Sequence, residues 1–146
     1  MLTEKDYCDY DTCVALKKLG YKEKTLAYYT SEGFFHWIRA YIYDVAIPDL
    51  ANSSNKKPYK HVIDAMSLYE AQKWLREEKK IIIEATFNLM YKGQPRFSWR
   101  VLYNLTQHKG AYYTLDSVLS KEDYDSYEEA LSEGIKSAVK RLKDKQ

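Results

Sequence analysis

The fold is decided by the stretch from residue 81 to residue 105, which reads IIIEATFNLMYKGQPRFSWRVLYNL. From Ile81 to Leu89, apolar residues occupy every second position, and this alternation is typical of a half-buried strand. The same alternation returns from Phe97 to Leu105, after the turn-forming Lys92-Gly93-Gln94-Pro95. The stretch therefore predicts an antiparallel hairpin in which each strand has one apolar face.

Shorter strands are predicted on either side of this hairpin. A strand from Ala111 to Leu115 is expected to extend the sheet into a three-stranded meander. Nearer the N-terminus, the aromatic and β-branched segments Thr25 to Thr30 and Phe34 to Tyr43 flank Ser31-Glu32-Gly33, so they predict a second hairpin. The polar, turn-rich residues 48–60 that follow are predicted to form a mobile loop.

Three helices are predicted around these strands. The first runs from Asp11 to Leu19 and is ended by Gly20, because glycine tolerates the left-handed conformation at a helix end. Capping boxes at Ser67-Leu68-Tyr69-Glu70 and Ser126-Tyr127-Glu128-Glu129 predict the starts of two more. The sequence thus predicts one α+β domain over residues 1–146. Its antiparallel sheet comprises the N-terminal hairpin and the three-stranded meander, and about three helices pack on it.

The overall charge and the cysteines limit which ligands and which cellular location are expected for this protein. The net charge is only +2, from 23 Lys and Arg against 21 Asp and Glu, so nucleic acid held mainly through its phosphates is not expected. Cys8 and Cys13 lie five residues apart, a spacing that does not bring two side chains together on a helix. Reduced thiols and a cytoplasmic location are therefore expected. No apolar run resembles a signal peptide or a membrane span, so no membrane association is expected.

Residues suited to catalysis or metal binding are scattered along the sequence. His36, His61 and His108 share no helical or strand register, and neither cysteine belongs to a paired metal-binding motif. The five glycines are dispersed and form no phosphate-binding loop. Cys13 has no histidine nearby in the sequence to activate it as a nucleophile. We therefore expect a protein without a metal, a cofactor or catalytic activity, and an enzyme of undetected type is the least favoured alternative.

One combination of residue types points to ligand binding. Trp37, Arg39 and Tyr41 share one face of a predicted strand, and Arg96 and Arg100 lie on the second strand of the main hairpin. Arginine forks bind phosphate or carboxylate through two contacts, while aromatic faces stack on bases. The five residues therefore predict a site for a small anionic or nucleotide-like ligand.

A second interpretation fits the same residues. In this interpretation, one face of these strands belongs to the core. The other face is covered by a helix or a second subunit, and the arginines lie at the edge of that covered face. The protein is in that case a protein–protein interaction module without a small ligand. A homo-oligomer is also expected, because the segment Phe34 to Tyr43 carries aromatic residues on both faces and the chain has few apolar helices to cover them.

Three segments carry a resemblance to known proteins: YDTCVALKKLGY at 10–21, AQKWLREE at 71–78 and YEEAL at 127–131. Together they resemble small uncharacterised proteins of Bacteroides-type gut bacteria and of their phages and prophages. The resemblance implies a cytoplasmic accessory protein of bacterial or phage origin. Phage accessory proteins of this size often occupy a host protein or sequester a nucleotide signal of host defence, and either role is compatible with the two interpretations above.

Overall fold

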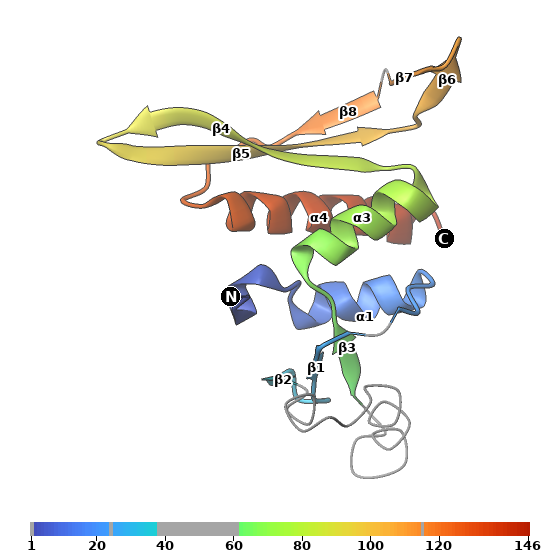
Figure 1. Ribbon diagram of the computed structural model, residues 1–146, viewed down its shortest axis with the longest axis vertical. Coiled ribbons are helices and arrows are strands. Elements are labelled where there is room, and N and C mark those ends of the chain that lie inside the picture. Colours follow the sequence, from blue (N-terminus) through green and yellow to red (C-terminus); the bar gives the residue numbers. More distant parts are fainter. Residues whose placement is uncertain (1, 24, 38–61, 115) are drawn as a thin grey trace. The chain divides into compact units, whose positions relative to one another are not determined.

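The computed structural model describes residues 2–23, 25–37, 62–114 and 116–146 (Figure 1). Over these residues the chain forms three α-helices and small antiparallel sheets. The predicted α+β class is confirmed, and the arrangement is consistent with a single domain.

Contacts between Cα atoms gather into two compact units. The hairpin unit comprises Met1–Asp6 and Leu68–Gln146, and the N-terminal unit comprises Tyr7–Ser67. A short 3-10 helix, η1 (Glu4–Asp6), belongs to the hairpin unit. Each unit is described by itself.

The hairpin unit is built on the hairpin that the sequence predicts. β4 (Ile82–Tyr91) and β5 (Gln94–Tyr103) pair antiparallel, with Ile83 opposite Val101. In the connecting Lys92-Gly93 both residues have positive φ, 48° and 77°. A two-residue turn with this backbone matches the twist of the flanking strands, so the turn holds the two strands in register.

The third strand of this sheet is not the predicted one. β8 (Asp116–Leu119) pairs with β5, which gives the strand order β4-β5-β8. The segment Ala111 to Leu115 was expected in that place, but β7 (Ala111–Tyr113) instead pairs with β6 (Thr106–His108) in a separate two-stranded ribbon. The tight turn at Lys109-Gly110, with φ of 49° and 81°, explains this local pairing.

A β-bulge shifts the register within β4. Phe87 lies opposite Phe97, but Leu89 lies opposite Arg96, so β4 has one extra residue between these pairs. A shift of one residue moves the following side chains to the other face of a strand. The predicted alternation from Ile81 to Leu89 therefore holds as far as Phe87 and is wrong for Leu89.

Two helices accompany the sheet, α3 (Leu68–Lys79) and α4 (Tyr127–Asp144), and both begin where the capping boxes predict. The Ser126 hydroxyl accepts a hydrogen bond from the backbone N–H of Glu129 at 3.1 Å. The Glu129 carboxylate in turn accepts one from the backbone N–H of Asp125 at 3.3 Å. No helix within the described residues is both long and apolar enough to cross a membrane.

Helix α4 lies along one face of β4 and β5 (Figure 1). The helix approaches the sheet closely at Gly134, because a Cβ atom there would lie 2.9 Å from Cγ2 of Ile83 and 3.3 Å from Cβ of Trp99. The core between helix and sheet contains the buried residues Ile83, Ala85, Val101, Ala130, Leu131, Ile135, Ala138 and Val139.

The N-terminal unit contains one helix and a three-stranded sheet. Helix α1 (Tyr10–Lys18) follows the predicted segment closely. Its N-terminus is capped by Asp9, whose carboxylate accepts a hydrogen bond from the backbone N–H of Thr12 at 2.9 Å. Gly20 has a φ of 109°, so the predicted left-handed conformation after the helix is confirmed.

The sheet of this unit has the strand order β2-β1-β3. β1 (Ala27–Tyr29) and β2 (Phe35–Trp37) form the predicted hairpin, although both strands are shorter than predicted where the structure describes them. The rest of the predicted strand Phe34 to Tyr43 and the predicted mobile loop 48–60 lie outside the described residues. β3 (Ile63–Ala65), which pairs with β1, was not predicted.

Both cysteines are buried, and neither is part of a disulfide. The Tyr29 hydroxyl donates a hydrogen bond to the Cys8 carbonyl at 2.6 Å, and the Cys13 thiol approaches the same carbonyl at 3.6 Å. The two cysteines therefore lie in the core of the N-terminal unit, and the Cys8 carbonyl joins its first segment to β1.

Candidate functional site

Trp37 lies at the end of β2 in a cluster of aromatic rings. Its ring centroid is 5.3 Å from that of Tyr7 and 5.2 Å from that of Phe35, both at an interplanar angle of 88°. On the other face of the strand, His36 stacks on Tyr28 with centroids 5.4 Å apart. Trp37 remains 41% exposed, so part of its surface is available for a partner or a ligand.

Arg39 and Tyr41, which were predicted to share the face of Trp37, lie outside the described residues, as does His61. Of the five predicted ligand-binding residues, the structure therefore describes Trp37 in the N-terminal unit and two arginines in the hairpin unit.

The Arg96 side chain is bound by a carboxylate and a backbone carbonyl of the same chain. Its guanidinium forms an ion pair with the Asp125 carboxylate and donates a hydrogen bond to the Asp123 carbonyl at 2.9 Å. Only a quarter of the Arg96 side chain is exposed, against 82% for Asp125. Arg96 therefore anchors the segment that precedes α4 to the end of the hairpin.

Arg100 is also paired within the chain. Its Nε and Nη2 atoms donate to Oε2 of Glu84 at 2.9 and 2.5 Å, and the two residues face each other across β4 and β5. Half of the Arg100 side chain is exposed, so this pair adds at most about 1 kcal/mol to stability. An anionic ligand at Arg96 or Arg100 would have to displace a carboxylate that is already in place.

The apolar side chains at the turn end of β4 are exposed. Phe87, Met90 and Tyr91 expose 57%, 58% and 57% of their surface, and Leu89 exposes 40%. Isolated apolar residues are common on protein surfaces, but a contiguous group of large ones marks an interaction site. We call the segment Thr86–Tyr91 the open edge.

The sheet ends at β4 on this side. Nearer the start of β4, helix α3 covers the strand, and the Gln72 side-chain amide donates a hydrogen bond to the Ile83 carbonyl at 2.7 Å. Beyond Ala85, no strand in the described part of the chain pairs with the free side of β4. Backbone N–H and C=O groups that lack a neighbouring strand can pair with another extended chain.

The opposite side of the hairpin is closed by the segment between β8 and α4. Phe97 and Tyr124 exchange two backbone hydrogen bonds, at 2.9 and 2.8 Å, and the Ser120 N–H donates to the Trp99 carbonyl at 2.9 Å. The side-chain amide of Asn88 reaches Asp123 in the same segment. The hairpin is therefore closed along β5 and open along the end of β4.

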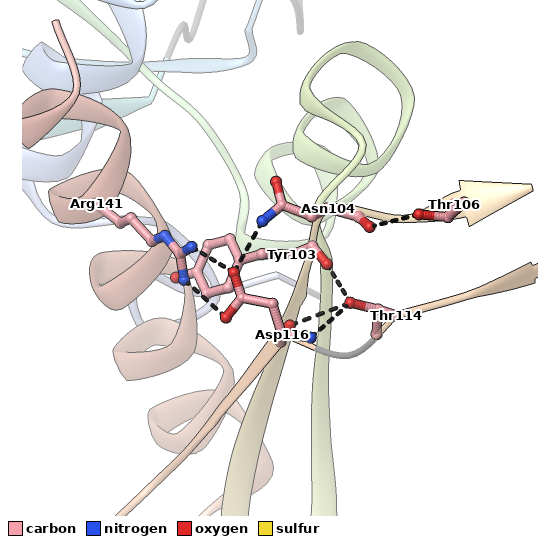
Figure 2. A network of polar contacts seen from close by, with 6 residues as sticks. All are labelled: Tyr103, Asn104, Thr106, Thr114, Asp116 and Arg141. Carbon is pink, nitrogen blue, oxygen red and sulfur yellow. Dashed lines mark hydrogen bonds and ion pairs between the residues drawn. The ribbon is translucent and has the colours of Figure 1, made fainter.

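Figure 2 shows how Arg141 ties α4 to β5 and β8. Its guanidinium contacts the Asp116 carboxylate at 2.5 and 3.3 Å and lies 3.8 Å from the ring centroid of Tyr103. The Asn104 amide donates to that carboxylate at 2.9 Å, and the Thr114 hydroxyl bonds the Tyr103 carbonyl.

Hydrogen bonds from the Arg141 guanidinium lower the pKa of Asp116, and burial raises the pKa of the Tyr103 hydroxyl. The positive charge of Arg141 is thus balanced by a carboxylate of the same chain. This network fixes the junction between helix and sheet and is a structural feature rather than a ligand site.

A groove of about 760 Å³ lies beside the start of α4. Two of its carboxylates already have structural roles: Glu129 caps the helix end and Glu133 pairs with Lys136 at 3.0 Å. The groove is lined by Thr3, Lys5, Asp6, Tyr124, Asp125, Ser126, Glu128, Glu129, Ser132, Glu133 and Lys136.

The described residues offer no group of three His, Cys, Asp or Glu side chains that could hold a metal ion. His108 ends β6 and is exposed, and Cys13 is buried against the Cys8 carbonyl. Comparisons with protein-family models, with curated proteins and with solved structures find no match. The candidate site therefore rests on the geometry of this chain.

The open edge was not selected from the sequence. The signal for it was present, because the run from Ala85 to Tyr91 has no charged residue, no proline and no glycine. An uncharged strand segment of this kind pairs readily with another strand when it lies at the border of a sheet. Its location at the border depends on which strand pairs with which, and this is a property of the fold.

Proposed function

We propose that this chain is a non-catalytic protein-interaction module that docks another polypeptide on the open edge of β4. The proposal is carried by one observation: apolar, uncharged side chains and a free strand border occur together at Thr86–Tyr91. Backbone pairing supplies affinity in this mode of recognition, and the alternate side chains supply specificity. The resemblance to phage and gut-bacterial proteins adds a cytoplasmic host protein as one possible class of partner.

Natural proteins usually protect a sheet border with charges, prolines, β-bulges or very short strands. Over the open edge β4 has a β-bulge after Phe87 but no charge and no proline, whereas the Gln72 side chain covers the earlier part of the strand. The absence of charge and proline from this exposed half favours a role in binding.

The alternative is a protein that binds a small anionic or nucleotide-like ligand through Trp37, Arg39, Tyr41, Arg96 and Arg100. Within the described residues, both arginines of the hairpin unit have carboxylate partners of their own. A ligand would therefore gain only the difference between its own contacts and those that it replaces. This exchange makes the ligand-binding alternative less favoured than protein docking.

Site-specific photo-cross-linking tests the proposal. A photoreactive amino acid is placed at Met90, on the open edge, or at Leu119, an equally exposed apolar position on β8. We expect protein adducts in cells from position 90 and none, or far fewer, from position 119. Equal yields at the two positions would contradict docking at the open edge.

A thermal-shift screen against nucleotides and other anions tests the alternative in parallel. A ligand that binds only the folded protein at 100 times its dissociation constant adds about 2.7 kcal/mol of stability. A shift that disappears in Arg100→Ala, in a variant that melts like the parent, would favour ligand binding over protein docking.

A further inference from the structure

We infer that the polypeptide docked on the open edge is a second copy of this chain, paired antiparallel with the first along Thr86–Tyr91 of each. A twofold axis perpendicular to two strands relates them in an antiparallel pair, so one strand border serves both copies. The inference rests on the proposed function, since it names the partner of the same surface.

The charge distribution suits this pairing. The open edge carries no charge, so two copies do not repel each other along it. When Thr86 of one copy lies opposite Tyr91 of the other, Phe87 lies opposite Met90, and these two apolar pairs flank the pairs of Asn88 with Leu89 at the twofold axis.

The length of the pairing is set by the fold. At one end the Gln72 amide already binds the Ile83 carbonyl, so the free border begins after this contact. At the other end the strand stops at Lys92-Gly93, where the backbone turns into β5. Only one segment of β4 is therefore available, and two copies of it have the same length.

The other border of the sheet does not offer an equivalent surface. β8 has only four residues and begins with Asp116, whose carboxylate binds Arg141. Further along, β5 is closed by the backbone bonds of Phe97 with Tyr124. Pairing of β4 with β4 uses the same border in both copies, so it stops at a dimer and does not continue into a filament.

Light scattering on charge variants tests the inference. The parent is expected at twice the chain mass of 17.3 kDa at micromolar concentration. The double variants Phe87→Glu with Met90→Glu, and Phe87→Lys with Met90→Lys, are expected to be monomers, with dissociation constants raised at least about 100-fold, because like charges meet across the axis. An equimolar mixture of the two variants is expected to form a heterodimer, since opposite charges then meet.

Leu119→Glu is the matched control. It places a charge on an equally exposed apolar residue of the same sheet, on β8, and is expected to leave the dimer unchanged. All variants are first compared with the parent by thermal melting, so that a loss of dimer is separated from a loss of fold. Amide hydrogen exchange supplies an independent readout, because protection of 86–91 should rise with protein concentration.

Each outcome supports or overturns the inference. A parent that is monomeric, a dimer that both double variants preserve, a mixture that fails to pair, or a dimer that Leu119→Glu breaks would overturn it. Cross-linking from position 90 tests the proposed function separately. Adducts with a different protein would retain docking at the open edge, and the absence of adducts specific to position 90 would reject both.

Discussion

Replacing Gly134 by alanine tests how closely α4 lies on the sheet. In a solvent-exposed helix this change is stabilising by about 1 kcal/mol, because alanine is the better helix former. In α4 the new methyl group would lie 2.9 Å from Cγ2 of Ile83 and 3.3 Å from Cβ of Trp99. Carbon atoms at optimal separation are about 3.5 to 4.0 Å apart, so helix or strand must shift.

The size of the effect follows from the two opposing contributions. Overfilling a packed core with a methyl group costs roughly 1 to 3 kcal/mol. The upper part of this range applies, because Ile83 is buried and the Cβ of Trp99 moves only with its backbone. After subtraction of the helix-propensity gain, Gly134→Ala is expected to destabilise by about 1 to 2 kcal/mol. For a chain of this size, that lowers the melting temperature by roughly 3 to 8 °C.

A double-mutant cycle measured by chemical unfolding isolates the contact. Ile83→Ala removes the Cγ2 atom and costs about 2 to 5 kcal/mol by itself. In that background Gly134→Ala has room for its methyl group, so it should become neutral or stabilising. Lys140→Ala, at an exposed position of α4, is the control and should change stability by less than about 0.5 kcal/mol. If Gly134→Ala stabilises the parent protein, the close packing of α4 on β4 is refuted.

Two further changes test a buried hydrogen bond and an ion pair. Tyr29→Phe removes the hydroxyl that donates to the buried Cys8 carbonyl at 2.6 Å, so chemical unfolding should show a loss of about 1 to 2 kcal/mol. Tyr91→Phe, at an exposed ring, should show almost none, and equal effects would contradict the assignment. Hydrogen bonds from Arg141 lower the pKa of Asp116, so their contribution to stability is complete above the unfolded pKa of about 3.9 and is lost as the pH falls through the lower folded pKa. Asp116→Asn should therefore melt below the parent at neutral pH, with a difference that shrinks in acid. A difference that stays constant would exclude this ion pair as its cause.

The parts of the fold that depend on neighbouring residues were predictable. The main hairpin follows from alternation over residues 81–105, and its turn falls within the predicted Lys92-Gly93-Gln94-Pro95, although Gln94 and Pro95 already belong to β5. The start of α4 follows from Ser126, which accepts from the Glu129 N–H as expected, whereas the Glu129 carboxylate accepts from the N–H of Asp125 rather than that of Ser126. Each of these features is encoded within a few residues, so periodicity and capping chemistry are sufficient to find it.

The parts that depend on distant pairing were not predictable in the same way. β3 is identified by its pairing with β1, because the alternation of its three residues, Ile63-Asp64-Ala65, is too short to mark a strand. The third strand of the sheet is β8 rather than β7, because β7 pairs with β6, and this choice of partners is not marked in the residues of either strand. The bulge after Phe87 changes the register without any glycine or proline to mark it.

The candidate site also has features that the sequence predicts and features that depend on distant pairing. Alternation correctly places Phe35 and Trp37 together, since both contact Tyr7. The sequence does not reveal that Arg96 and Arg100 find carboxylate partners, because Asp125 is distant in the sequence and Glu84 faces Arg100 only through the strand register. The residue types thus indicated that the chain could bind anions. In the structure, Arg96 and Arg100 already bind carboxylates of the same chain.

The position of α4 explains why the end of the hairpin is exposed. The first residue of α4, Tyr127, contacts Phe97 with ring centroids 6.5 Å apart, and Phe97 lies opposite Phe87. The hairpin continues past this point to its turn, beyond the start of the helix (Figure 1). A two-stranded hairpin is only marginally stable in water by itself, and exposed Met90 and Tyr91 contribute little to a core that they do not reach. Strand pairing with a second copy would give this extension both a neighbouring strand and an apolar cover, so its length is better explained by association than by the stability of one chain.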